Sequence, residues 1–185
     1  ALTPASETIL NNLISAVFGG LTVGLVATLV HRLTTNSVAA GLAALVFGFC
    51  PSFWGQAVFA EVYTLNAFFF ALALLCGVAW LQTDDDRWIA GGALSLGLGL
   101  TNHMTIALLA LALLAVLLRA PRRFPRRLLL AVAFTLAGFA LVALALAAAV
   151  LILYRRWNAV FGRRAHTAES TLAERARRLV EAEAR

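Results

Sequence analysis

Two long stretches without a charged side chain constrain the fold of this chain more than any other feature. Residues 9–30 and 128–154 contain neither acidic nor basic residues. A helix needs about 20 predominantly apolar residues to cross the hydrocarbon core of a membrane, and 62% of the chain is hydrophobic while only 13% is charged. The alternating segments that mark a transmembrane β-barrel are absent. The sequence therefore predicts an all-α fold, a polytopic bundle of transmembrane helices.

The apolar segments differ in length, and some do not fit a single span. We expect about five to six membrane segments, within the ranges 9–30, 37–50, 57–81, 88–118 and 128–154. Residues 37–50 would form only about 21 Å of helix and are followed by Pro51, so this segment is short or broken. The run 88–118 is long for one helix and short for two. It forms either a hairpin of two short helices or one tilted helix.

Arginine supplies all fifteen basic residues, and the net charge is +6. The arginines cluster at segment ends, where basic side chains orient helices by the positive-inside rule, so we expect no nucleic-acid partner. A hairpin at 88–118 places seven arginines in the cytoplasm and four outside, and a single helix places six inside and five outside. The counts favour the hairpin narrowly, with the arginines of the tail against it. In both arrangements residues 51–61 face the extracytoplasmic side.

The last 31 residues have a different character. We expect a transmembrane domain at 1–154 and a polar, Arg-rich tail at 155–185. Thr171 and Glu174 have the spacing of a capping box, which indicates a short interfacial or solvated helix. A frayed terminus is the alternative.

Glu61 is the only carboxylate between residues 8 and 83. A charged group in the hydrocarbon region is costly and usually faces a partner or a water-filled cavity. Irregular backbone at membrane depth survives only where protein or a cavity covers it. We therefore expect the segment 50–56 to dip below the outer surface and Glu61 to line that dip, facing the periplasm. The alternative is an ordinary acid in the headgroup zone.

Several polar or aromatic residues are further candidates for the same cleft. Gln56, Tyr63 and Asn66 fit one face of a helix, whereas Glu61 and Tyr63 would point about 160° apart. Trp54 and Tyr63 also have the character of interfacial aromatics, which leaves a structural role open.

Asn102 and His103 lie at the centre of the 88–118 run. In the hairpin, the Asn102–His103 turn lies toward the outer side, where Glu61 is also expected. One acid and one histidine could hold a divalent metal or an anionic head group. A buried, hydrogen-bonded structural histidine is the alternative.

Cysteines and glycines in the apolar runs have simpler interpretations. We expect Cys50 and Cys76 to be small core residues without a disulfide or metal. Gly91, Gly92, Gly97 and Gly99 indicate close helix packing.

Three stretches resemble one known family in the order in which that family carries them. They are "NNLISAVFGGLTVGLVATLVHRL" at 11–33, "PSFWGQAVFAEVYTLNAFFFALALL" at 51–75 and "GLGLTNHMTIALL" at 97–109. They resemble bacterial membrane proteins related to protein O-mannosyltransferases, in the glycosyltransferase C superfamily. Compared with full-length members of that family, the chain is expected to be a fragment that lacks the first helix and the first periplasmic loop. Such a fragment would be inactive alone.

The resemblance implies a multi-pass enzyme of the bacterial inner membrane. Its activity would be transfer of a hexosyl or mannosyl sugar from a polyprenyl-phosphate carrier to an extracytoplasmic protein or glycan, among membrane lipids. Glu61 matches the family's second acidic position, where it would bind a divalent metal or position the carrier phosphate. Asn102 and His103 match the family's "NH" and would contact the phosphate or sugar. The remaining substrate-binding candidates are Gln56, Tyr63 and Trp54.

Two other functions remain open from the residues. In a transporter or flippase-like module, Glu61 and His103 would relay protons or ions, although the sequence contains no internal repeat to support this. In a non-catalytic membrane scaffold, the same polar groups would only join helices.

Overall fold

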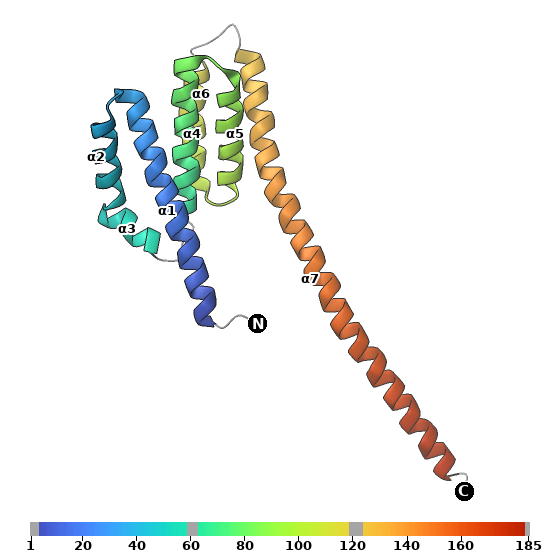
Figure 1. The fold of residues 1–185 in the computed structure, drawn as a ribbon. Helices are drawn as coiled ribbons and strands as arrows, with labels where there is room; N and C mark the ends of the chain where they lie inside the picture. The colour runs from blue at the N-terminus through green and yellow to red at the C-terminus, as the bar shows by residue number, and fades with distance from the viewer. Residues whose placement is uncertain (1–3, 59–62, 119–123, 184–185) are drawn as a thin grey trace. The chain divides into compact units, whose positions relative to one another are not determined.

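The computed structural model describes residues 4–58, 63–118 and 124–183, and these residues form helices and turns without a strand. The chain divides into two compact units, Ala1–Val142 and Ala143–Arg185. The helices, coloured by chain position in Figure 1, are α1 (Pro4–Thr34), α2 (Ser37–Gly48), α3 (Pro51–Val58), α4 (Tyr63–Thr83), α5 (Asp86–Leu100), the 3-10 turn η1 (Met104–Ile106), α6 (Ala107–Leu117) and α7 (Phe124–Glu183). The all-α prediction is confirmed.

The helices are those of a membrane bundle with short and broken members. Three stretches are long and apolar enough to cross a membrane, namely Thr8–Thr34, Tyr63–Thr83 and Phe124–Ala159. A fourth span is possible only if α2 and α3, which meet at a bend of 64°, count as one. Helices α5 and α6 are shorter. The number of complete spans among the described residues is therefore smaller than the number of apolar segments in the sequence.

Residues 88–118 form the hairpin, so the single tilted helix is wrong. The chain reverses after α5 because the backbone N–H groups of Asn102 and His103 both donate to the carbonyl oxygen of Gly99, each at 2.9 Å. The 3-10 turn and α6 then run back along α5 (Figure 1).

Two predicted boundaries are wrong. The segment predicted at 57–81 begins as α4 only at Tyr63, and Ala57 belongs to α3. Pro51 opens that separate helix because its fixed φ suits the first helical turn. Gln56 and Tyr63 consequently lie on different helices and do not share one helical face. Helix α7 begins at Phe124 and continues past Tyr154 to Glu183 without a break. The domain boundary at 154 stays a prediction.

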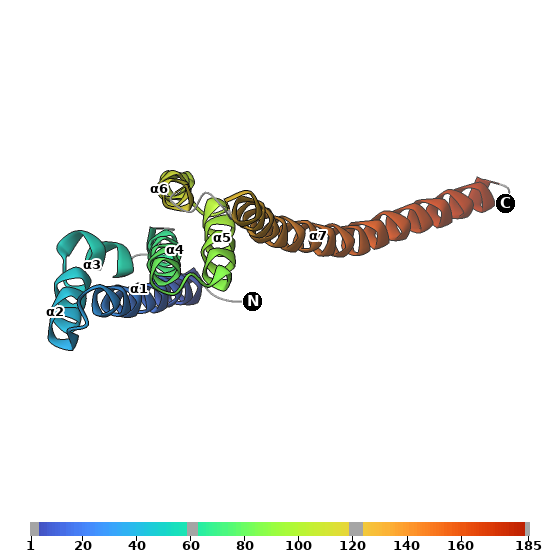
Figure 2. The same cartoon turned by 90° about the horizontal axis from the view of Figure 1, so that it is seen from above.

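Helix α4 lies at the centre of the first unit. It packs against α1 on one side and α5 on the other, and both views show it between them (Figure 2). Ala73 and Ala79 are completely buried in its interface, where small side chains let helix backbones approach closely. Cys76 is buried beside them, as predicted, whereas Cys50 is exposed at the end of α2, and both thiols are free.

Glycines set the distance between α5 and the first turns of α7. A β-carbon at Gly138 would lie 2.7 Å from the carbonyl oxygen of Leu94, and one at Gly97 would overlap the carbonyl of Thr135. Gly92 and Gly99 face α4 and η1 at similarly short range. The close helix packing predicted from Gly92, Gly97 and Gly99 is confirmed.

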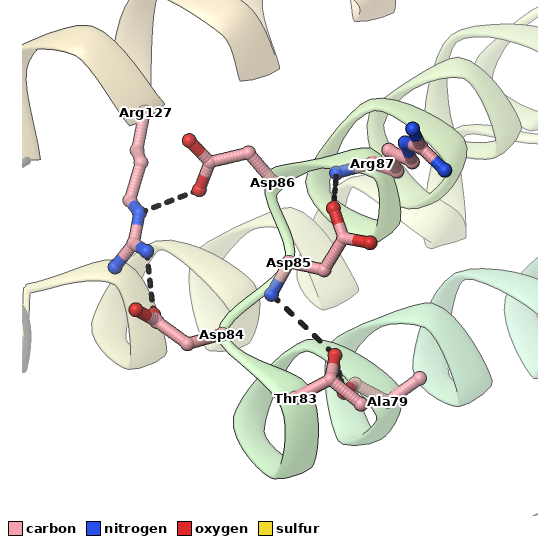
Figure 3. A network of polar contacts seen from close by, with 7 residues as sticks. All are labelled: Ala79, Thr83, Asp84, Asp85, Asp86, Arg87 and Arg127. Carbon is pink, nitrogen blue, oxygen red and sulfur yellow. Dashed lines mark hydrogen bonds and ion pairs between the residues drawn. The ribbon is translucent and has the colours of Figure 1, made fainter.

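One arginine joins the ends of three helices. Arg127, in the first turn of α7, is 1% exposed. Its Nε donates to Asp86 at 2.9 Å, and an Nη donates to Asp84 in the α4–α5 turn (Figure 3). Its guanidinium carbon also lies 5.0 Å from the ring centre of Trp80 on α4. The positive charge is thus held by two carboxylates and an aromatic face at the boundary of the apolar bundle.

The turn that carries these carboxylates is itself ordered by short-range hydrogen bonds. Asp85 caps α5 by accepting the backbone N–H of Arg87 at 2.9 Å, and the hydroxyl of Thr83 accepts the N–H of Asp85 (Figure 3). Asp84 takes a left-handed conformation with φ 53°, which Asp tolerates better than most residues.

A second arginine ties α1 to the same end of the unit. Arg32 donates to the side chain of Gln82 at 3.2 Å, and Gln82 donates back to the Arg32 carbonyl at 2.8 Å. The Arg32 guanidinium also stacks over Trp88 at 5.2 Å. The ends of α1 and α4 and the starts of α5 and α7 therefore meet in one polar layer.

We predict that Arg127→Met lowers the free energy of unfolding by about 1–3 kcal/mol, because it leaves two carboxylates without their buried cation. The measurement is the midpoint of denaturant unfolding of the purified chain in micelles. Arg126→Met is the matched control, since Arg126 is exposed one residue earlier. Equal midpoints for the two variants would contradict the structural role of Arg127.

A second prediction concerns the contact between α5 and α7. Gly97→Ala should destabilise the fold because its β-carbon meets the Thr135 backbone, which cannot turn away. Gly24→Ala on α1 meets no atom within 4 Å and should be neutral or stabilising by up to about 1 kcal/mol. Thermal unfolding of both variants in the same detergent checks the difference in sign.

Candidate functional site

The hairpin brings His103 to the first residue of α4. The rings of Tyr63 and His103 lie 5.7 Å apart between centroids, at an interplanar angle of 45°. Tyr63 is 43% exposed and His103 is half-buried, so both rings reach the surface. Two residues forty positions apart in sequence therefore lie side by side at the surface of the first unit.

Hydrogen bonds fix the orientation of the His103 ring. His103 precedes η1 in an extended conformation and caps it, because its Nδ1 accepts the backbone N–H of Thr105 at 3.3 Å. The hydroxyl oxygen of Thr105 lies 2.8 Å from the same Nδ1. Asn66 on α4 donates from Nδ2 to that hydroxyl oxygen at 3.3 Å. Asn66, Thr105 and His103 form a hydrogen-bonded chain.

This arrangement favours one tautomer of the imidazole. The Thr105 amide always carries its hydrogen, and a protonated Nδ1 would face that hydrogen directly. The Thr105 hydroxyl accepts from Asn66 and keeps its own hydrogen for Nδ1. In neutral histidine one nitrogen donates and the other accepts, so the proton of neutral His103 resides on Nε2. His103 thus offers an N–H donor on the edge of the ring that faces away from Thr105.

The first turn of α4 contains polar atoms that the described residues leave unsatisfied. The hydroxyl oxygen of Thr64 and the Oδ1 of Asn66 are buried without a hydrogen-bond partner in the described part of the chain. A buried polar atom without a partner costs about 1–3 kcal/mol. Of these two atoms, the Asn66 Oδ1 belongs to the side chain that also donates to Thr105 beside His103, whereas the Thr64 side chain lies against Gly19 of α1.

The other predicted site residues have different positions. Glu61 lies outside the described residues. Asn102 is half-buried in the hairpin turn beside His103. Trp54 and Gln56 lie on α3, where Trp54 stacks on Phe49 at 5.4 Å between ring centroids and is 53% exposed. The structure brings together Tyr63 and His103, with Asn102 adjacent to His103 in the turn, and it places Trp54 on α3.

The metal site predicted at Glu61 and His103 stays a prediction, because Glu61 lies outside the described residues. The Nδ1 of His103 is engaged by Thr105, so Nε2 is the ring nitrogen that faces away from Thr105. Within residues 4–58, 63–118 and 124–183, no group of three His, Cys, Asp or Glu side chains is placed to share an ion. The described part of the site is suited to binding an anion or a hydroxyl group.

Sequence reasoning missed Thr105. The signal was the spacing in "NHMT", where the residue two positions after His103 can bond back to the imidazole with both its amide and its hydroxyl. It also missed the pairing of "TDDDR" with Arg127, which opposite charges at the same predicted face could have indicated.

The depth of the site follows from helix length. Helix α5 has 15 residues and is therefore about 22 Å long, against a hydrocarbon core about 30 Å thick. If the Arg127–Asp86 layer marks one membrane boundary, His103 lies several ångströms short of the other. Ala57 on α3 packs against Gly19, near the middle of α1, with their β-carbon positions 3.0 Å apart. The dip of residues 50–56 below the outer surface stays a prediction.

Comparison with known proteins places the sequence in a family. A family model described as the protein O-mannosyl-transferase TMEM260 N-terminal domain matches residues 2–124. The mouse protein O-mannosyl-transferase TMEM260 is 33% identical over 107 residues, which cover 56% of this chain and 15% of the mouse protein. The chain thus spans only a small part of that relative.

No solved structure matches the chain. The matched region of the family model contains α1 to α6, including Tyr63, Asn66, the Asn102–His103 turn and Thr105. The chain therefore belongs to the family of the protein O-mannosyl-transferase TMEM260 N-terminal domain.

Proposed function

We propose that this chain forms part of the sugar-transfer site of a membrane glycosyltransferase. The reaction would move a mannosyl-type sugar from a polyprenyl-phosphate carrier to an acceptor hydroxyl on a protein or glycan, on the extracytoplasmic face. The observation that carries the proposal is the Asn66–Thr105–His103 chain, which presents one N–H donor beside an exposed aromatic ring. The family membership and the depth of the site support it.

The leaving group of such a reaction is an anionic phosphate. Donors that are oriented before the reaction stabilise developing charge without further reorganisation. The Nε2–H of His103 is such a donor, because Thr105 holds the ring through two contacts. In the proposal it bonds a phosphate oxygen of the carrier, and Tyr63 offers the adjacent sugar or isoprenoid an aromatic surface.

The depth of the site suits a carrier that approaches through the membrane. A polyprenyl phosphate keeps its chain in the bilayer and its phosphate near the boundary. A site several ångströms below the surface, beside the bent α2–α3 pair, would receive the phosphate without moving the isoprenoid chain into water. This geometry favours a lipid-linked donor over a water-soluble sugar nucleotide.

The proposal also assigns a role to Glu61, whose position lies outside the described residues. It is separated from Tyr63 by one residue. A carboxylate beside a phosphate requires a cation or a proton between them, and a divalent metal at Glu61 therefore stays a prediction. The described residues supply anion binding, and the base that deprotonates the acceptor is assigned to none of them.

We predict that Glu61→Gln reduces sugar transfer by about 100-fold or more in a full-length protein that carries this segment, because an essential charge is lost. The measurement is the transfer of radiolabelled mannose from polyprenyl phosphate to an acceptor in membranes. Membrane insertion and expression should match the unmodified protein. Normal transfer would remove Glu61 from the site. Lost stability with normal transfer would instead support a scaffold, and carrier binding with lipid translocation but no transfer would support a flippase.

A matched pair of substitutions tests which nitrogen of His103 acts. His103→Gln places an amide N–H near the position of Nε2, and His103→Asn places one near Nδ1. We expect His103→Gln to retain clearly more transfer than His103→Asn, whose loss should be about 100-fold. Equal losses would contradict the assignment of the donor.

The role of Thr105 is tested separately by spectroscopy. In the ¹⁵N-histidine-labelled chain, the His103 signals should show a protonated Nε2 at neutral charge, with His103→Gln used for assignment. Thr105→Val should shift the population toward the other tautomer, and Thr105→Ser should preserve it. An unchanged tautomer in Thr105→Val would show that the hydroxyl does not orient the ring.

A further inference from the structure

The hairpins α1–α2 and α4–α5 have the same turn, forty-nine positions apart in the sequence. The corresponding residues are Thr34, Thr35 and Asn36 in the first turn and Thr83, Asp84 and Asp85 in the second. The threonine at each helix end accepts the N–H of the residue that caps the next helix, at 3.3 and 3.4 Å. The residue between them has φ 53° in both turns, and the cap side chain accepts the N–H two positions later at 2.9 Å in both. The two hairpins are therefore repeats of one structural unit.

The correspondence extends along the helices on either side of the turn. Buried residues of α1 match buried residues of α4 at the same separation of forty-nine, and α2 matches α5 in the same way. The matching pairs are Ser15 with Thr64, Thr22 with Ala71, Ala40 with Ile89 and Ala44 with Ala93. Few aligned residues are identical, so the repeat is visible in the structure and not in the sequence. Equivalent positions of α1 and α4 can therefore be compared face by face.

One face of the repeat is covered on α4 and open on α1. Ala73 on α4 is completely buried in a cluster shared with α6, and a β-carbon at Gly77 would lie 2.7 Å from the side chain of Leu113 on α6. The equivalent residues of α1 are Gly24 and Thr28, and both are exposed. No described atom lies within 4 Å of a β-carbon placed at Gly24. The face that holds a helix in the second hairpin thus has no helix on it in the described part of the first.

The open face of α1 contains both parts of such a helix contact. Four exposed small residues recur at every fourth position and share one side of the helix; they are Ala16, Gly20, Gly24 and Thr28. Small residues let the backbones of membrane helices approach closely. Beside them, the larger side chains of Val17 and Leu21 are 52% and 49% exposed. Helix α1 therefore offers small residues like those of α4 and, next to them, large apolar side chains like Leu113 of α6.

We propose that this face pairs with the same face of α1 in a second copy of the chain. Gly20 and Gly24 of the two copies would cross at close range, and Val17 and Leu21 of each copy would pack over the glycines of the other. Because each α1 supplies both surfaces, the contact is self-complementary, as a two-fold symmetric dimer requires. The hydroxyl of Thr28 donates to the carbonyl oxygen of Gly24 in its own helix at 2.9 Å, so it needs no polar partner across the contact.

Energy transfer between labelled copies tests the proposal in the full chain. Cys76→Ala leaves the exposed Cys50 as the single thiol, and this thiol carries either a donor or an acceptor fluorophore. The two preparations are mixed in phosphatidylcholine vesicles at increasing dilution of protein in lipid. We expect energy transfer well above that of randomly distributed chains, and an excess of unlabelled chain should remove it. Transfer at the random level would overturn the proposal, because lipid alone would then cover this face.

Matched glycine substitutions identify the face that pairs. Gly24→Leu on α1 and Gly41→Leu on α2 add the same side chain at positions where no described atom lies within 4 Å of the new β-carbon. We expect Gly24→Leu to weaken self-association about tenfold or more, because it separates the two helices, and Gly41→Leu to leave it unchanged. Gly20→Leu should act like Gly24→Leu. Equal self-association in Gly24→Leu and Gly41→Leu would overturn the assignment to α1, and thermal unfolding of each variant checks that the single chain is still folded.

Discussion

The buried guanidinium of Arg127 is the interaction on which the first unit depends. A cation removed from water is tolerated only with compensating partners, and here two carboxylates and the Trp80 ring supply them. Asp84 and Asp86 flank the turn between α4 and α5, so pairing with Arg127 fixes where α7 starts relative to both helices. The glycine contacts between α5 and α7 can form because this end is already held. Arg32, through Gln82 and Trp88, adds α1 to the same layer.

The opposite end of the hairpin is organised by neutral groups. His103 caps η1, Thr105 orients its ring, and Asn66 connects both to α4. A single-turn helix is a weak element, but this one begins at a residue whose side chain and backbone are both engaged. The candidate site therefore has an oriented imidazole connected through Thr105 to Asn66, whose Oδ1 has no hydrogen-bond partner among the described residues.

The sequence predicted much of the fold because membrane insertion acts through simple variables. Apolar length identified α1, α4 and α7, Pro51 marked the break after α2, and the arginine counts selected the hairpin correctly. Glycine composition indicated the close approach of α5 to its neighbours. The exact start of α4 was missed, since residues 57–62 are as apolar as the helix that follows. Composition also could not show that the extended backbone at His103 directs Nδ1 toward Thr105.

Long-range pairing was the other part that periodicity could not supply. Arg127 is one of five arginines within residues 119–127, and nothing in that run distinguishes the residue that becomes buried. Its neighbour Arg126 is exposed, because helical geometry turns adjacent side chains about 100° apart. Only the position of α7 against the α4–α5 turn selects Arg127. The same limit applies to Asn66, whose partner lies 39 residues away.

The shortness of α5 and α6 connects the two ends of the unit. A pair of helices about 16–22 Å long, anchored at one boundary by Arg127 and its aspartates, cannot reach the other boundary of a bilayer of ordinary thickness. In the proposed function, the turn that carries His103 would lie below the membrane surface, where a lipid-linked phosphate could meet it. At the anchored end, α4, α5, α6 and α7 line an apolar cavity of about 280 Å³ beside Trp80. Alanine and glycine residues in this lining are too small to fill the space between the helices. The Arg127 ion pairs, the position of the His103 turn and the apolar cavity beside Trp80 are thus all connected with the short length of the α5–α6 hairpin.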